Sequence, residues 1–167
     1  MWLWEGDSHV GTVKEVVLNP ERTQILLDRF VYADTPAARK PSIKPLCLFE
    51  VAAYLIEQIP TALEIIFTLG HRIDGYHDQA ALSAARSELL ESMGAEQIKV
   101  LTRPNSAGEN EILVEAVWRY NAGNRDALQG ALMAARQAHQ LAPPPPPSSG
   151  GTWLSRLVPR LPFRRLR

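Results

Sequence analysis

The chain has 167 residues, of which 46% are hydrophobic and 22% charged, and its 18 basic side chains balance its 18 acidic ones. This composition predicts one soluble domain with an appendage, and the single cysteine, Cys47, excludes a disulfide-stapled scaffold. The first residues lack the pattern of a signal peptide, and no uncharged stretch is long enough to span a bilayer. We therefore expect a cytoplasmic protein, and its excess of arginine over lysine is typical of a GC-rich bacterial genome.

The first half of the chain predicts a hairpin and a buried helix. Val10–Leu18 and Thr23–Tyr32 are rich in β-branched and aromatic residues, and Asn19-Pro20-Glu21-Arg22 between them has turn chemistry. A helix follows from Pro45, a residue suited to the first helical turn, and ends at Pro60. Because the helix has apolar side chains on most of its sides, we expect it to be buried.

The second half predicts three strands and two helices. In chain order these are the strand Ala62–Leu69, the helix Asp78–Met93, the strands Gln97–Thr102 and Glu111–Tyr120, and the helix Asn124–His139. Asp78 and Asn124 are the expected N-caps, and Gly94 ends the first of these helices. Ile66 and Leu89 are expected at the interface between sheet and helices.

The element order β-β-α-β-α-β-β-α predicts an α/β (α+β) fold. We expect a two-layer sandwich in which a mixed sheet of about five strands carries helices on one face. The strand–helix–strand segment 62–102 should form a parallel crossover, and the two hairpins should be antiparallel. One domain at 1–140 would contain all of these elements.

A proline-rich linker at 141–151 and a cationic tail at 152–167 follow the domain. The tail has five arginines and no acidic residue, so the rest of the chain holds 13 basic against 18 acidic side chains. The alternation of arginine and apolar residues favours contact with an anionic membrane surface, although Pro159 and Pro162 exclude one continuous helix. The expected contact residues are Trp153, Leu154, Arg156, Leu157, Arg160, Leu161, Phe163, Arg164, Arg165 and Arg167.

Two other interpretations of the tail stay open. It is either the binding segment for a protein partner or nucleic acid, or a disordered end without a function. Nucleic acid is less favoured, because the body is acidic and a nucleic-acid-binding body would carry basic residues. The sequence leaves the oligomeric state open.

The segment 70–78 is the best candidate ligand site, because it follows the expected central strand and precedes a helix. Arg72 and Gly75 are candidates for anion binding, and His71, Asp74 and His77 for catalysis. The alternative is a polar surface loop in which Asp78 is an ordinary cap. The glycines of this segment stand alone, so no nucleotide-binding pattern is present.

Other residues with chemical potential have simpler interpretations. Cys47 lies in an apolar helix, where a buried, inert thiol is the usual case. Trp2 and Trp4 are expected to fold onto the sheet or cover its edge, the alternative being an exposed partner contact. No metal site or cofactor is expected.

These observations favour a non-enzymatic interaction or adaptor module that the tail tethers to a membrane or a larger assembly. The alternative is a small enzyme of the acyl- or phosphoryl-transferase type, with its ligand at 70–78.

Overall fold

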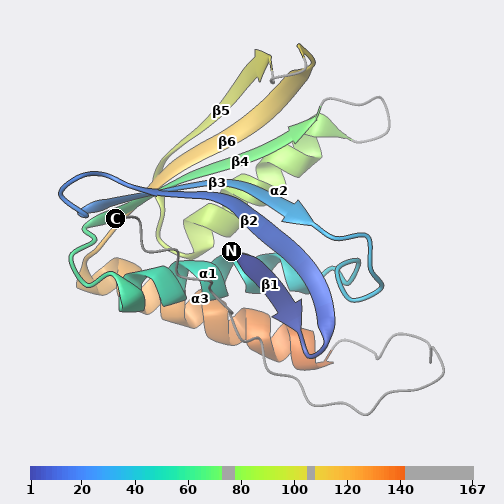
Figure 1. The fold of residues 1–167 in the computed structure, drawn as a ribbon, viewed down its shortest axis with the longest axis horizontal. Helices are drawn as coiled ribbons and strands as arrows, with labels where there is room; N and C mark the ends of the chain where they lie inside the picture. The colour runs from blue at the N-terminus through green and yellow to red at the C-terminus, as the bar shows by residue number, and fades with distance from the viewer. Residues whose placement is uncertain (73–77, 105–107, 142–167) are drawn as a thin grey trace, which may run out of the picture.

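The computed structural model describes residues 1–72, 78–104 and 108–141 (Figure 1). Within these ranges the strands are β1 (Trp2–Glu5), β2 (Ser8–Leu18), β3 (Gln24–Tyr32), β4 (Glu64–Arg72), β5 (Glu96–Pro104) and β6 (Asn110–Arg119). The helices are α1 (Ile43–Gln58), α2 (Gln79–Ser92) and α3 (Ala122–Leu141). The expected α+β fold is confirmed, with β1 as an additional strand.

All six strands belong to one mixed sheet in the order β1-β2-β3-β4-β6-β5. The hairpins β2–β3 and β5–β6 are antiparallel, as expected. The turn of the first hairpin is fixed by Asn19, whose Oδ1 accepts hydrogen bonds from the backbone N–H groups of Thr23 (2.8 Å) and Gln24 (2.9 Å). Asn19 therefore holds β3 in register as the strand begins.

The crossover connections differ in one respect from the expected topology. β4 and β5 run in the same direction, as predicted, but β6 lies between them and is antiparallel to both. The adjacent parallel pair is instead β3 with β4, which α1 connects. The position of β5 leaves room for one strand beside β4. β6 occupies this position as the hairpin partner of β5.

One face of the sheet carries the core. In the three central strands β3, β4 and β6, cross-strand neighbours on this face are almost completely buried: Ile25, Leu27, Ile65, Phe67, Leu69, Val114, Ala116 and Trp118. The indole Nε1 of Trp118 donates a hydrogen bond of 2.9 Å to the backbone oxygen of Met93, just after α2. This bond ties β6 to the helical layer, and Figure 1 shows the helices on one side of the sheet.

The helix α1 is buried on several sides, as its composition predicts. Four consecutive residues, Leu46 to Phe49, are each less than 4% exposed, which requires cover in every direction around the helix. The sheet lies on one side and α3 packs on another. The residues that α3 buries are Leu128, Leu132 and Ala135, which recur at helical spacing.

Leu89 of α2 is partly buried and packs against the core, as expected, although the fully buried positions of this helix are Ser83 and Leu90. One local expectation about a helix start is wrong. The N-cap of α3 is Asn121 rather than Asn124, because Asn121 Oδ1 accepts the backbone N–H of Asn124 at 2.8 Å. Asn124 instead donates through Nδ2 to the backbone oxygen of Arg119 at 2.9 Å.

The expected placement of Ile66 at the sheet–helix interface is also wrong. The neighbouring residue Ile65 is fully buried on the helix side, and side chains alternate along a strand, so Ile66 lies on the opposite face. The run Ile65-Ile66-Phe67 is apolar throughout, and composition alone therefore does not reveal which residues point inward.

This pair of adjacent isoleucines provides a matched test of the sheet's orientation. Ile65→Ala should lower the free energy of unfolding by about 2–5 kcal/mol, because it leaves a cavity in the core. Ile66→Ala should lower it by less than about 2 kcal/mol, because a half-buried side chain loses less apolar contact. Chemical denaturation of both variants measures the difference, and equal losses would contradict the assignment of the two faces.

Candidate functional site

The loop expected at 70–78 as a ligand site starts later than predicted, because β4 continues to Arg72. His71 and Arg72 belong to β4, where they pair with Ile112 and Glu111 of β6. Asp74, Gly75 and His77 lie outside the described residues. Asp78 is the N-cap of α2, as predicted, and its side chain accepts the backbone N–H of Ala81 at 3.0 Å. The ligand site at this segment stays a prediction.

A polar cluster of four side chains joins β1, α1 and α3, and nothing in the sequence pattern predicts it. Glu5 Oε1 accepts hydrogen bonds from Lys40 Nζ (2.9 Å) and from His139 Nε2 (2.6 Å). The other ring nitrogen of His139, Nδ1, lies 3.0 Å from Ser42 Oγ. The side chains of Glu5, Lys40 and His139 are only 10–15% exposed. Water therefore screens these interactions less than it would on an open surface.

The fold brings these four residues together from distant parts of the chain. Glu5 ends β1, Ser42 precedes the first turn of α1, and His139 lies in the last turn of α3. Although Ser42 is the N-cap residue of α1, its hydroxyl makes no capping bond and contacts His139 instead. Three residues earlier in α3, Arg136 forms a bidentate ion pair with Glu50 of α1. The cluster thus continues a polar seam between the two helices.

The order of groups in the polar cluster has chemical meaning. If Nε2–H of His139 donates to Glu5, Nδ1 is unprotonated and accepts the hydroxyl proton of Ser42. Hydroxyl, imidazole and carboxylate then follow the order of a nucleophile, a base and an orienting acid. Lys40 compensates the charge of Glu5, so the same contacts also stabilise the packing of three elements.

Cys47, one turn into α1, is buried and unsuited to nucleophilic chemistry. Burial raises the pKa of its thiol to about 12, and the nearby Glu5 and Glu50 carboxylates act in the same direction. A thiol with so high a pKa holds little thiolate at neutral pH. The interpretation as a buried, inert cysteine agrees with this environment.

Trp2 and Trp4 belong to the edge strand β1 and flank one residue of β2. Their ring centroids lie 5.0 and 5.2 Å from that of His9. Of the two expected arrangements, folding onto the sheet or covering its edge, the second is confirmed, because β1 is the outermost strand. Trp2 nevertheless remains half exposed at the edge of the sheet.

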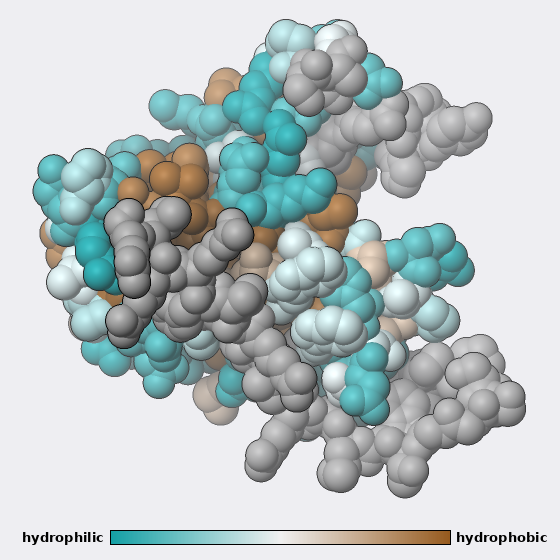
Figure 2. All heavy atoms as spheres, in the orientation of Figure 1, coloured by the Kyte–Doolittle hydropathy of each residue, from teal (hydrophilic) through white to brown (hydrophobic). Residues whose placement is uncertain are grey.

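The face of the sheet opposite the helices carries two adjacent rows of side chains. The first row is apolar and crosses four strands: Val17, Leu26, Ile66 and Val117. Val17 is 51% exposed, and the other three are partly exposed. Figure 2 shows apolar side chains reaching the surface over the strand ends at the left of the view. We call the face of the sheet opposite the helices the open face.

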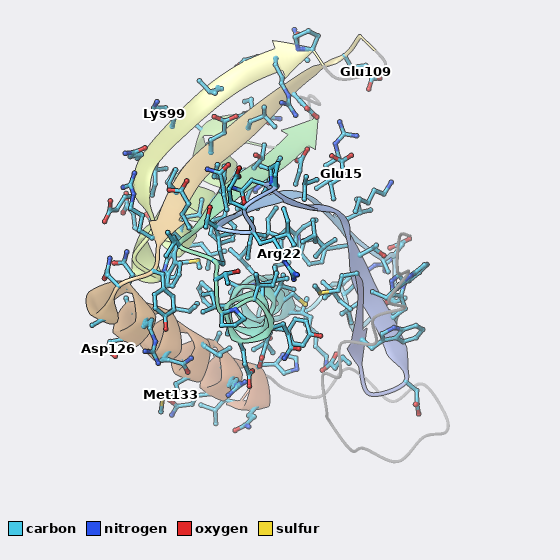
Figure 3. The ribbon with its side chains drawn as sticks, turned by 60° about the vertical axis from the view of Figure 1, so that its left-hand side comes forward. Glu15, Arg22, Lys99, Glu109, Asp126 and Met133 are labelled. Carbon is cyan, nitrogen blue, oxygen red and sulfur yellow. The ribbon has the colours of Figure 1, made fainter. Side chains whose placement is uncertain are left out.

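The second row of the open face is polar and runs across five strands. Its members are paired in register, in the order Glu15, Asp28, Thr68, Glu115 and Lys99. Figure 3 shows Glu15 and Lys99 on the strands, away from Asp126 and Met133 on α3. Three carboxylates and one ammonium group give the row an acidic character.

Asp28 is the distinctive member of this row. Its Oδ1 is buried and has no hydrogen-bond partner among the described residues, while Oδ2 lies 3.8 Å from Arg29 Nε. Burial raises the pKa of Asp28 above its ordinary value, and Glu15 also raises it, although Arg29 opposes the shift. A buried acceptor without a donor is unfavourable, so the position of Asp28 Oδ1 costs the fold stability.

Neither metal-binding nor membrane-spanning features occur in the described ranges. No group of three or more metal-ligating side chains is assembled there. None of the helices in these parts of the chain combines the length and apolar content that a bilayer crossing requires. The tail residues expected to contact a membrane or partner lie beyond the described residues.

No protein-family model matches this chain, and no curated protein matches it.

Proposed function

We propose that the protein is a non-enzymatic interaction module that binds a partner protein on its open face. The tail tethers it to an anionic surface at the cytoplasmic side of a membrane. The observation that carries the proposal is the pair of parallel rows on the open face, one apolar and one acidic. An apolar row that is partly exposed and bordered by polar side chains is typical of an interface.

The chemistry of the two rows defines the partner. Residues two apart on a strand are separated by about 6.6 Å, so the rows run side by side at that spacing. A partner segment that carries lysine or arginine beside apolar side chains matches both rows.

The tail supplies the second half of the proposal. The five prolines of the linker span roughly 15 Å in an extended conformation, which separates the tail from α3. Each tail arginine can contribute up to about 1 kcal/mol on an anionic membrane. The body, with its excess of acidic groups, would be repelled from the same surface and remain accessible to a partner.

Liposome sedimentation tests the tether. Full-length protein should sediment with acidic liposomes, and a chain ending at Ala142 should not. Binding should weaken as salt rises, because charges are screened over about 10 Å at 0.1 M salt. Replacing Trp153 and Phe163 by serine should reduce binding mainly at high salt, and replacing Arg164, Arg165 and Arg167 by glutamine mainly at low salt. Full-length protein that ignores acidic liposomes at low salt would disprove lipid anchoring and favour a protein or nucleic-acid partner for the tail.

Affinity capture from the native host tests the open face separately, with the chain ending at Ala142 so that the tail plays no part. Val17→Lys should reduce the captured partner at least about tenfold, because it removes an apolar contact and repels a basic segment. Met133→Lys on α3, which adds the same charge at an exposed position, should have no effect. A partner lost equally from both variants would show that the open face is not its binding surface.

A second candidate function, acyl transfer, is favoured by the polar cluster rather than by the segment 70–78. Ser42 Oγ would attack the carbonyl carbon of an ester while its proton passes to Nδ1 of His139. The leaving alcohol would take that proton, and water would then hydrolyse the acyl group from Ser42. Ser42 is partly exposed.

Labelling with a fluorophosphonate, which reacts with activated serines, tests this candidate directly. The wild-type chain should be labelled at Ser42, and both Ser42→Ala and His139→Gln should abolish the label. Ser87→Ala should leave the label in place, because Ser87 bonds to a backbone oxygen within α2. Absence of labelling in the wild-type protein would leave the polar cluster with its packing role alone.

A further inference from the structure

The outer edge of β5 is long and uncovered. β5 is the last strand of the sheet, and within the described residues it pairs only with β6. Most of its residues are exposed, including Val100 at 54% and Leu101 at 41%. In Figure 1, β5 and β6 project at the top of the view. Such an edge presents backbone N–H and C=O groups to any strand that approaches.

The opposite edge of the sheet is protected in a way that this one is not. β1 has only four residues, and its register with β2 shifts between Leu3 and Trp4. In β5 the irregularity is confined to the start, around Gln97, whose φ is +54°. From Lys99 to Pro104 the strand keeps one register with β6 and is regular. β5 therefore offers an edge of regular register, whereas β1 does not.

We propose that β5 pairs antiparallel with β5 of a second copy of the chain, so that one continuous sheet runs through a dimer. In such a pair the twofold axis is perpendicular to the sheet, so facing residues lie on the same face. Each register then centres on a single residue of β5. The three central registers are those centred on Lys99, Val100 and Leu101. They differ in which side chains they place opposite each other.

Two of these registers bring like charges together. Centring the pair on Lys99 places Lys99 opposite Lys99 of the second copy. Centring it on Leu101 places Lys99 opposite Arg103 twice. Like charges that face each other across strands are destabilising.

The register centred on Val100 avoids these conflicts. Val100 faces Val100 of the second copy, and Ile98 faces Thr102 on the same side of the sheet. On the other side Lys99 faces Leu101, where the lysine stem can cover the leucine while its ammonium group stays in water. Arg103 already pairs with Glu111 of its own chain at 3.1 Å. The two exposed apolar residues of β5 are thus both covered in this one arrangement.

The dimer does not rest on the proposed interaction with a partner, because strand pairing at the β5 edge needs no contact across the open face, although Lys99 belongs to both surfaces. If the tail also binds membranes, a dimer presents two tails, and the second attachment is strengthened by the first.

Two measurements on the full chain test the dimer. Sedimentation of the wild-type protein at about 100 µM should give twice the mass of the chain, at a concentration where specific dimers of micromolar affinity are formed. Val100→Asp should give the single-chain mass, because the variant places two carboxylates opposite each other. Met133→Asp, equally charged but on α3, should remain a dimer. A wild-type protein of single-chain mass would overturn the proposal and assign the edge to another partner.

Oxidative cross-linking tests the register. Val100→Cys should form a disulfide-linked dimer, because directly opposed residues of antiparallel strands have Cα atoms about 4.5–5.5 Å apart, within disulfide range. Wild-type protein should not cross-link, because Cys47 is buried. Met133→Cys serves as the exposed control. Equal cross-linking of the two cysteine variants would contradict the register centred on Val100, even if a dimer is present.

Discussion

The fold depends on keeping the apolar side chains of α1 out of water. This helix is apolar on nearly all sides, so a sheet alone would leave part of it in water. α3 supplies the missing cover, and the ion pair between Arg136 and Glu50 fixes how the two helices lie against each other. The other elements serve the same requirement, since the inward residues of β3, β4 and β6 form the wall on which α1 rests.

Gathering the helices on one side leaves the other side of the sheet for another role. The strands that bury Ile65, Phe67 and Trp118 must present their alternate residues outward. That requirement alone would give scattered polar positions. An apolar row beside an acidic row is a more specific pattern, and it lies across strands rather than along one segment. A surface of this kind arises from the register of the strands, and it is the surface on which we propose that a partner binds.

The sequence predicts the elements well and the contacts between them poorly. Hairpin, helices and capping residues such as Asp78 follow from local chemistry, and most boundaries agree within about three residues. The inward phase of β4 could not be predicted, because Ile65 and Ile66 are chemically identical and only the sheet distinguishes them. The polar cluster joins Glu5 to His139, 134 positions apart, and no periodicity relates two residues so distant.

The position of β6 determines when the sheet can be completed. Among the described residues β6 is the last strand in sequence, yet it lies between β4 and β5. Until Arg119 has left the ribosome, β4 lacks a neighbour on one side and β5 has no partner strand at all. Before that point the sheet ends at β4, and the hairpin of β5 and β6 then completes it by adding to the free edge of β4. The edge that β4 presents during synthesis is thus covered only by the hairpin that follows it in the chain.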